Sequence, residues 1–207
     1  MRLAAVLMAL LLAGCAAGGD TTPAATATGG ALPADLLPGD EWVLMTSTAV
    51  PKAPQFGVTM QFDEGKVSGK APVNRYFGTV AVSGQGLAFG PLATTQMAGP
   101  PAAMTAETEY MKALAQVTGW QLADEVLTLT GSDGPLLQFA APDSTGAFAV
   151  TLLGKPQGQA KAAAIAAGYD WRVVSVDGTP KTVTGDYRPQ RIDAGVEDGR
   201  VTSVAVG

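Results

Sequence analysis

VTMQFDEGKVSGKAPVNRYFGTVAVSGQGLAFGPLATTQMAGPP, residues 58–101, contains short apolar runs that are separated by glycine-containing turns. The apolar runs fall at 57–62, 77–82 and 87–89. Runs of this length, bounded by Gly, Asn and Asp, predict antiparallel strands joined by tight turns. This stretch therefore predicts the β-rich part of the fold.

The same pattern continues on both sides of this stretch. Further apolar runs fall at 42–45, 122–129 and 136–139. One segment differs, because the apolar residues between Pro101 and Gly119 recur at the spacing of one helical face. Proline favours the start of a helix, and glycine favours its end. Strands with one helix predict an α+β unit of about a hundred residues, a common domain size.

The order and spacing of these residues resemble one known family. The matching positions are Gly69, Asn74, Arg75, Tyr76, Phe77, Gly78, Thr94, Met97 and Ala98. Together with the helix that follows, they closely resemble the META domain, also called HslJ-like, of bacterial envelope proteins. The resemblance covers residues 40–141. It implies an antiparallel, β-rich domain with one helix and a loosely defined role linked to envelope stress and heat shock.

The resemblance also singles out positions around the asparagine. The family usually has a cysteine just before the asparagine and another after Met-Ala, where this chain has Val73 and Gly99. Losing a native disulfide typically costs about 2–5 kcal/mol, so we expect packing around Val73 to compensate. Asn74, Arg75 and Tyr76 fit a binding site, and they fit equally well a turn asparagine followed by half-buried strand residues.

A second unit is predicted after the break Pro-Asp-Ser-Thr-Gly at residues 142–146. The alanine-rich residues 157–168 predict a short helix that Gly168 ends in a left-handed conformation. An alternating strand follows at 171–176, and residues 199–206 supply a final strand. The second unit is therefore predicted to be a small α+β module with the order helix, strand, long loop, strand.

The long loop of this unit contains the sequence VTGDYRPQRID, residues 183–193. Together with LLGKP at 152–156, the acidic turn at 197–199 and the final VTSVAVG, it resembles the elastase-inhibitor type of peptidase inhibitor, which is similar to potato inhibitor I. The resemblance implies a peptidase inhibitor-like domain at residues 147–207 whose extended loop enters a serine protease as a substrate does. The implied inhibitory residues are Thr184, Gly185, Asp186, Tyr187 and Arg188.

The same resemblance assigns roles to single positions. It places the scissile bond between Gly185 and Asp186, and it makes Arg191 the residue that supports the loop by a hydrogen bond to Asp186. Two positions depart from the family. Gly185 stands where a large apolar side chain is usual, and Asp193 stands where potato-type inhibitors have a second supporting arginine. The glycine implies a serine protease with a small pocket, of the elastase-like kind.

The amino-terminal sequence MRLAAVLMALLLAGC has one arginine, an apolar run and then small residues, which is the order of a secretory signal. Residues 1–14 are therefore predicted to be a signal peptide. The four residues LAGC resemble the bacterial lipobox, which implies cleavage before Cys15 and a lipid on its thiol. The alternative is an ordinary signal in which this cysteine is incidental.

The residues after the cysteine bear on localisation. Ala16 stands where an aspartate would imply retention at the inner membrane. The resemblance therefore implies a lipid anchor in the cell envelope, at the outer membrane. Small residues, threonine and proline dominate residues 15–39, and such a segment predicts a flexible tether.

Charge and composition exclude several classes of function. The formal net charge is −5 and charged residues make up 15% of the chain, so no face can carry the dense basic footprint that nucleic acid requires. The chain has no histidine and one cysteine, which excludes Ser-His-Asp and Cys-His nucleophiles and the familiar zinc and haem sites. The acidic pairs at 63–64, 124–125 and 197–198 are typical of exposed turns. We expect a protein that is not an enzyme and has no metal or cofactor.

Two functions remain open from the sequence. The first is a lipid-anchored envelope protein that inhibits a serine protease through residues 184–188. The second is a non-inhibitory envelope maintenance or binding lipoprotein of META type, in which both units are scaffolds. Slow cleavage of the bond between Gly185 and Asp186 in a stable complex with a protease would separate the two.

Overall fold

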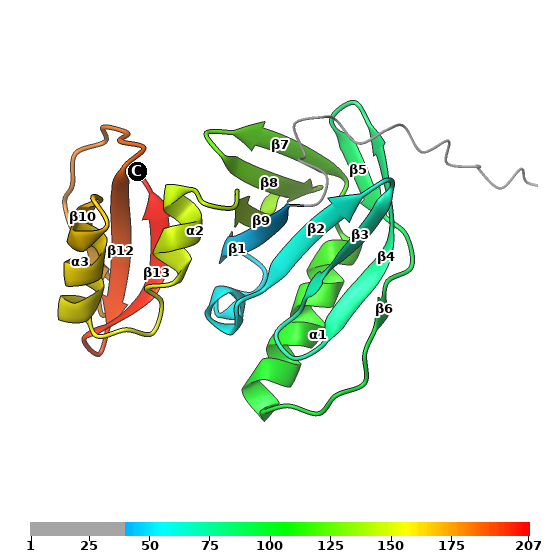
Figure 1. The fold of residues 1–207 in the computed structure, drawn as a ribbon, viewed down its shortest axis with the longest axis horizontal. Coiled ribbons are helices and arrows are strands. Elements are labelled where there is room, and N and C mark those ends of the chain that lie inside the picture. The colour runs from blue at the N-terminus through cyan, green and yellow to red at the C-terminus, as the bar shows by residue number, and fades with distance from the viewer. Residues whose placement is uncertain (1–39) are drawn as a thin grey trace, which may run out of the picture.

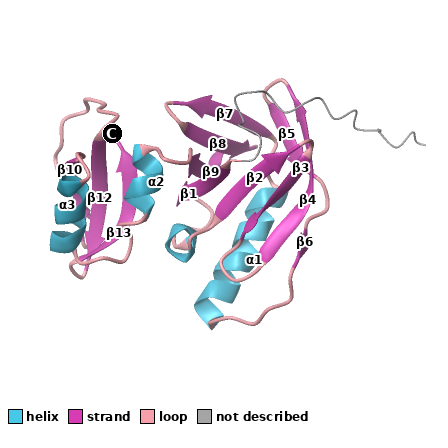
Figure 2. Cartoon of the chain, viewed as in Figure 1, coloured by secondary structure: helices cyan, strands magenta, loops and turns pink. Residues whose placement is uncertain are grey.

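The computed structural model describes residues 40–207. The predicted signal peptide, the tether and the lipid attachment at Cys15 lie outside the described residues. The described chain is mostly β, with an eight-stranded antiparallel barrel, a small mixed carboxyl-terminal sheet and three α-helices (Figure 1). The α+β prediction is thus confirmed in part: strands and helices occur in both units, but strands predominate (Figure 2).

The barrel consists of eight strands that close into a ring. In chain order they are β1 (Glu41–Ser47), β2 (Thr59–Asp63), β3 (Lys66–Lys70), β4 (Arg75–Ser83), β5 (Gly86–Phe89), β7 (Gly119–Ala123), β8 (Val126–Gly131) and β9 (Gly134–Ala140). Neighbours follow the order β3-β2-β1-β9-β8-β7-β5-β4, and the pairing of β3 with β4 completes the ring. The short strand β6 (Ala93–Thr94) also pairs with β4. Closure removes the free sheet edges to which another chain could pair.

The helix α1 (Pro101–Ala115) packs into the barrel core. It begins at the predicted proline, but it ends at Ala115, and Gly119, which was predicted to end it, begins β7. Tyr110 and Leu114 of this helix are fully buried in the same apolar cluster as Trp42 and Phe139. A short 3-10 helix, η1 (Ala53–Phe56), follows β1 and contacts α1. The apolar face of the helix is therefore buried against the side chains that the barrel strands contribute to the core.

The carboxyl-terminal unit combines two helices with a four-stranded sheet. Its elements are α2 (Thr145–Val150), α3 (Gln157–Ala166), β10 (Asp170–Val176), β11 (Thr179–Pro180), β12 (Arg191–Glu197) and β13 (Arg200–Val206). The strand order is β11-β10-β12-β13, with β10 parallel to β12 and β13 antiparallel to it. Because parallel neighbours cannot be joined by a tight turn, a long connection must run between β10 and β12.

The central strand β12 presents different chemistry on its two faces. Ile192 and Ala194 are fully buried in a cluster that includes Ala149 of α2 and Ala164 of α3. Side chains alternate along a strand, so Arg191 and Asp193 point to the other face. That face is covered by the long connection, and its two buried charges become the base of the candidate site.

One sequence-based strand assignment is wrong. The run at 122–129 was predicted as a single strand, whereas the structure divides it into β7 and β8, joined by a tight turn at Asp124 and Glu125. Both turn residues have positive φ, 50° and 63°. The apolar residues continue on both sides of the turn without a glycine, and this hid the reversal in the sequence.

Two further elements were missed in the second unit. The break at 142–146 is partly helical: α2 begins at Thr145, and the Ser144 hydroxyl caps it by accepting a hydrogen bond of 3.2 Å from the Ala147 amide. Strand β12 was read as part of the loop, because its apolar residues alternate with Arg191 and Asp193. Those charges are buried on the face opposite the helices, where they bond to each other and to the loop.

The barrel and the carboxyl-terminal unit share a core. Met45 of β1 and Ala140 of β9 belong to the buried cluster that contains Leu152 and Val204. Gly146 permits this approach, since a Cβ at that position would lie 2.7 Å from the Ala140 Cβ and 3.2 Å from the Met45 Sδ. The two units are therefore packed directly against each other through α2.

Val73 and Gly99, the two positions at which the resemblance implies cysteines, lie against each other. A Cβ on Gly99 would lie 2.7 Å from the Val73 Cγ2 and 3.4 Å from its Cβ. The valine methyl groups therefore pack directly on the glycine, in line with the expected compensation by packing. The Cβ separation is also close to the range of about 3.5–4.5 Å that a disulfide requires.

We expect the double substitution Val73→Cys and Gly99→Cys, made in a Cys15→Ser chain, to form a disulfide. Closing this loop of about 25 residues should raise the free energy of unfolding by about 3 kcal/mol relative to the reduced form. Urea unfolding with and without reductant measures the difference, and the Val73→Cys single variant is the control. A double variant with the same free energy of unfolding in the presence and absence of reductant would contradict the prediction.

Candidate functional site

The candidate site is the connection between β11 and β12, residues 181–190, which lies at one end of the carboxyl-terminal unit (Figure 1). Every residue of this connection is exposed, and residues 181–188 have no regular secondary structure. It contains all five predicted loop residues. An exposed, extended segment of this kind keeps its shape only if neighbouring groups hold it.

Asp186 is the centre of the bonds that hold the loop. Its carboxylate accepts hydrogen bonds from the Thr184 hydroxyl, from Arg188 Nε at 2.8 Å and from Arg191 Nη1 at 3.1 Å. These three bonds, with Thr184 first, hold the pKa of Asp186 well below its usual range. Arg191 also donates to the Asp186 carbonyl oxygen. The hydrogen bond that was predicted from Arg191 to Asp186 is therefore present.

Arg172 is a functional candidate that sequence reasoning missed. It lies on β10, directly opposite Asp193 in the parallel ladder. Its Nε donates to Asp193 Oδ1 at 2.7 Å and its Nη2 donates to Oδ2, so the two groups form a bidentate pair. The bonds to Asp193 raise the pKa of Arg172. The remaining nitrogen, Nη1, donates to the Thr184 carbonyl oxygen at 2.9 Å.

Asp193 acquires a clear role from this geometry. The side chain is only 8% exposed, and besides Arg172 it accepts a bond of 3.2 Å from Arg191 Nε. An aspartate at this position therefore anchors an arginine from the neighbouring strand. The sequence could have indicated this pair only through the register of β10 and β12, and that register cannot be assigned until β12 is recognised as a strand.

Together the two arginines bracket one peptide bond. Arg172 holds the carbonyl oxygen of Thr184, and Arg191 holds that of Asp186. Between them, the Cβ direction of Gly185 meets no heavy atom within 4 Å. The backbone on both sides of Gly185 is thus fixed, while the position between is open to a partner.

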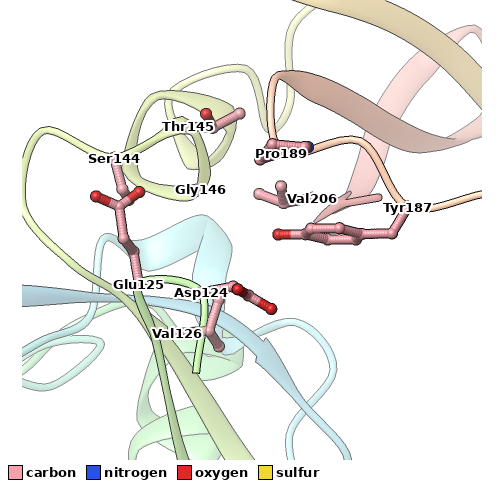
Figure 3. Close-up of a pocket in the computed structure, with 9 residues that line it drawn as sticks. All are labelled: Asp124, Glu125, Val126, Ser144, Thr145, Gly146, Tyr187, Pro189 and Val206. Carbon is pink, nitrogen blue, oxygen red and sulfur yellow. The ribbon is translucent and has the colours of Figure 1, made fainter. Parts of the chain in front are cut away.

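A groove separates the loop from the barrel (Figure 3). It has a volume of about 270 Å³, with Tyr187, Pro189 and Val206 on one side and the β7–β8 turn on the other. Tyr187 is 53% exposed, and its pKa is raised by partial burial and then by the charges of Asp124 and Glu125. The part of the loop after Asp186 therefore lies next to the barrel.

The comparisons with known proteins now identify the barrel. A family model described as META domain matches residues 34–144, more than half of the chain. The chain belongs to the META domain family. No curated protein matches it.

Three solved structures resemble parts of this META domain protein. An NMR structure of a protein from Burkholderia xenovorans is 26% identical, with a TM-score of 0.41, and the match covers 61% of this chain and 99% of that one. A second NMR structure is 22% identical, with a TM-score of 0.38 and coverage of 50% and 90%. A DUF4847 family protein from Bacteroides vulgatus is 16% identical, with a TM-score of 0.39 and coverage of 49% and 91%.

Within the META domain, Asn74 and Tyr76 have structural roles. Asn74 and Tyr76 are 3% and 1% exposed, whereas Arg75 is exposed. The Tyr76 hydroxyl donates to the Thr59 carbonyl and lies 3.0 Å from the Tyr110 hydroxyl, and burial raises its pKa. Because these polar groups are satisfied inside the barrel, they do not form a binding surface.

Glu107 completes this buried network and was not recognised in the sequence. It lies on α1, is 8% exposed, and its Oε2 accepts hydrogen bonds from the amides of Val73 and Asn74 at 2.9 and 2.7 Å. Its Oε1 accepts from Asn74 Nδ2 at 2.7 Å. In turn, Asn74 Oδ1 accepts from the Met97 amide at 2.7 Å. The META domain thus ties its helix to two loops through one carboxylate.

Residues 40–207 contain neither a metal-binding cluster nor a membrane-spanning helix. No group of three or more His, Cys, Asp or Glu side chains is placed to hold a metal ion in this part of the META protein. No helix in the same residues is long and apolar enough to cross a membrane.

Proposed function

We propose that this META domain protein inhibits a serine protease through residues 184–188, with the bond between Gly185 and Asp186 presented as a substrate. One observation carries the proposal: arginines from two neighbouring strands hold the carbonyl oxygens on both sides of Gly185. This is the support that the resemblance to peptidase inhibitors leads one to expect, and part of it is supplied by a different arginine.

The physical basis of inhibition is preorganisation. A loop that is already extended and braced loses little conformational entropy when it docks, so more of the contact energy appears as affinity. Charge-assisted hydrogen bonds are the strong kind, and three arginines make them to this loop or its anchor. The same bonds hold both sides of the scissile bond in place, which opposes separation of the ends after a cut.

Gly185 defines the class of target and also favours a second candidate function. With no side chain, it fits an enzyme with a small primary pocket, of the elastase-like kind. An anchor side chain at an interface centre can contribute about 2 kcal/mol or more, and glycine gives up that contribution. The second candidate is therefore a non-inhibitory envelope maintenance or binding protein of META type, in which the braced loop is structural.

The proposed location follows from the amino-terminal sequence. Cleavage before Cys15 and a lipid on its thiol would anchor the protein to the outer membrane, since each buried CH₂ of an acyl chain contributes about 0.8 kcal/mol. Metabolic labelling with a radioactive fatty acid, with Cys15→Ser as the control, tests the anchor. Equal labelling of the unaltered protein and of the Cys15→Ser variant would contradict the lipid anchor.

The function is tested by titrating the full-length protein, in mild detergent, against pancreatic elastase, chymotrypsin and subtilisin. Residual activity and the intact mass of the inhibitor are followed together. Stoichiometric inhibition, with slow cleavage only between Gly185 and Asp186, supports the proposal. Absence of inhibition by all three enzymes, or rapid cleavage within the loop, would favour the non-inhibitory function.

The substitution Gly185→Leu should strengthen inhibition of chymotrypsin and subtilisin by about thirtyfold, because leucine fills an apolar pocket that glycine leaves empty. A Cβ at this position meets no heavy atom of the protein itself within 4 Å. Inhibition constants for both enzymes measure the effect. Gly158→Leu is the matched control, because Gly158 is exposed on α3 and a Cβ there also meets no heavy atom within 4 Å. Equal constants for the two variants would refute the loop assignment.

A further inference from the structure

We propose that the META barrel supplies a second contact for the same protease, through the β7–β8 turn at Asp124 and Glu125. The partner that this surface fits is a serine protease with a basic side chain beside the subsites that bind the residues after the scissile bond. The inference rests on the proposed inhibitory function. It adds a role for the barrel, which the resemblance to inhibitors does not assign.

The first argument is continuity. Tyr187 is the second residue after the scissile bond, and its ring forms one wall of the groove. The opposite wall is the turn with Asp124 and Val126 (Figure 3). An enzyme that binds the loop as a substrate must surround Tyr187, and the barrel surface that it meets beside this residue is that turn.

The second argument is the area that a stable complex requires. Protease–inhibitor interfaces of standard size bury about 800 Å² on each partner. The loop here is short, and Gly185 contributes no side chain at its centre. Additional surface must therefore come from beside the loop, and the barrel is packed against the loop-bearing unit on the side of Tyr187 and Pro189.

The third argument is charge. Asp124 and Glu125 are exposed and form no ion pair within residues 40–207, whereas Asp186 is already neutralised by arginines. Their positive φ values fix them in a tight turn, so the two carboxylates are presented by rigid backbone. A lysine or arginine of the enzyme that entered the groove would meet these carboxylates and the face of Tyr187, both of which attract cations.

The test neutralises the turn without straining it. Asparagine tolerates positive φ, so Asp124→Asn with Glu125→Asn removes both charges and keeps the turn. The matched control is Asp63→Asn with Glu64→Asn, which alters the same pair of residue types in the tight turn between β2 and β3. The probe is pancreatic elastase, a basic enzyme, and the association rate with each full-length variant is measured at low and high salt.

The expected result is specific to the turn. Association of the Asp124 and Glu125 variant should be about threefold to tenfold slower at low salt, because complementary charges act mainly on the encounter rate. The difference should vanish near 1 M salt, where the screening length falls to about 3 Å. In the complex of the unaltered protein, the amides of residues 123–126 should exchange more slowly with solvent, and those of residues 63–66 should not change.

Failure of the inference can be told apart from failure of the function. If the unaltered protein inhibits elastase, but the turn variant matches the control at both salt concentrations and residues 123–126 gain no protection, only the second contact is refuted. If the unaltered protein does not inhibit elastase and forms no complex, the proposed function fails for this enzyme, and the second contact is overturned with it.

Discussion

The substitution Arg172→Met should weaken inhibition by about tenfold to a hundredfold and speed cleavage between Gly185 and Asp186 by a similar factor. Methionine keeps the aliphatic stem of the arginine but removes every donor. The Thr184 carbonyl then has no partner that holds it to the sheet, and Asp193 keeps only the bond of 3.2 Å from Arg191. Truncating one member of a buried charge pair leaves the other without its partner, so the substitution loosens the support of the loop before any enzyme binds.

The measurements are the inhibition constant against elastase and the rate of cleavage followed by intact mass. Arg200→Met is the control, because Arg200 lies in the same sheet and donates to the Gly154 carbonyl, away from the loop. Circular dichroism checks that both variants stay folded. Equal inhibition by the two variants would show that Arg172 does not position the loop.

A rescue variant separates positioning of the loop from general stability. In the Arg172→Met background, Asp193→Arg would place an arginine where potato-type inhibitors carry their second supporting arginine. We expect part of the lost inhibition to return. In contrast, Asp193→Arg alone should weaken inhibition as much as Arg172→Met does. It places a third guanidinium beside Arg172 and Arg191 in a buried position.

The second large effect is expected in the barrel, where Glu107→Gln should lower the free energy of unfolding by about 2–3 kcal/mol. A glutamine can still accept the two backbone hydrogen bonds with its one oxygen. Its amide nitrogen would then face Asn74 Nδ2, which is also a donor. Asn74 cannot turn over without losing the bonds that its Oδ1 accepts from Thr95 and the Met97 amide.

Urea unfolding measures this loss, and a double substitution tests its cause. Asn74→Asp together with Glu107→Gln exchanges donor and acceptor, so the pair can bond again, and most of the stability should return. The control is Glu109→Gln on the exposed side of the same helix, where the glutamate forms only a surface pair of 2.8 Å with Lys112. A double variant less stable than Glu107→Gln would contradict this account of the network.

The sequence predicted the parts of the fold that depend on local chemistry. Glycine-bounded apolar runs located most barrel strands, and the two prolines before residue 102 located the start of α1. The end of α1 was misplaced, because the helix stops at Ala115 without a glycine and Gly119 begins β7. The loop and the bond from Arg191 to Asp186 were predicted from a family resemblance. The resemblance sufficed for this bond because the two residues lie five positions apart, within one sequence motif.

The missed features depend on contacts between distant residues. The pair of Arg172 and Asp193 spans 21 positions and exists only because β10 and β12 are parallel and in register. Glu107 reaches Asn74 across 33 positions for a similar reason. The turn at Asp124 lacks glycine and uses acidic residues in a left-handed conformation, which is uncommon outside glycine and asparagine.

The shared core has a mechanical consequence. Strand β1 begins at residue 41, directly after the amino-terminal segment, and Met45 within it packs into the core of the loop-bearing unit. A pull on the loop by a bound enzyme, resisted by an anchor at the amino terminus, would load this strand in shear along its two antiparallel neighbours. Hydrogen bonds loaded in this way share the force, so under the proposed anchoring and inhibition β1 would resist traction between the amino-terminal end and the loop.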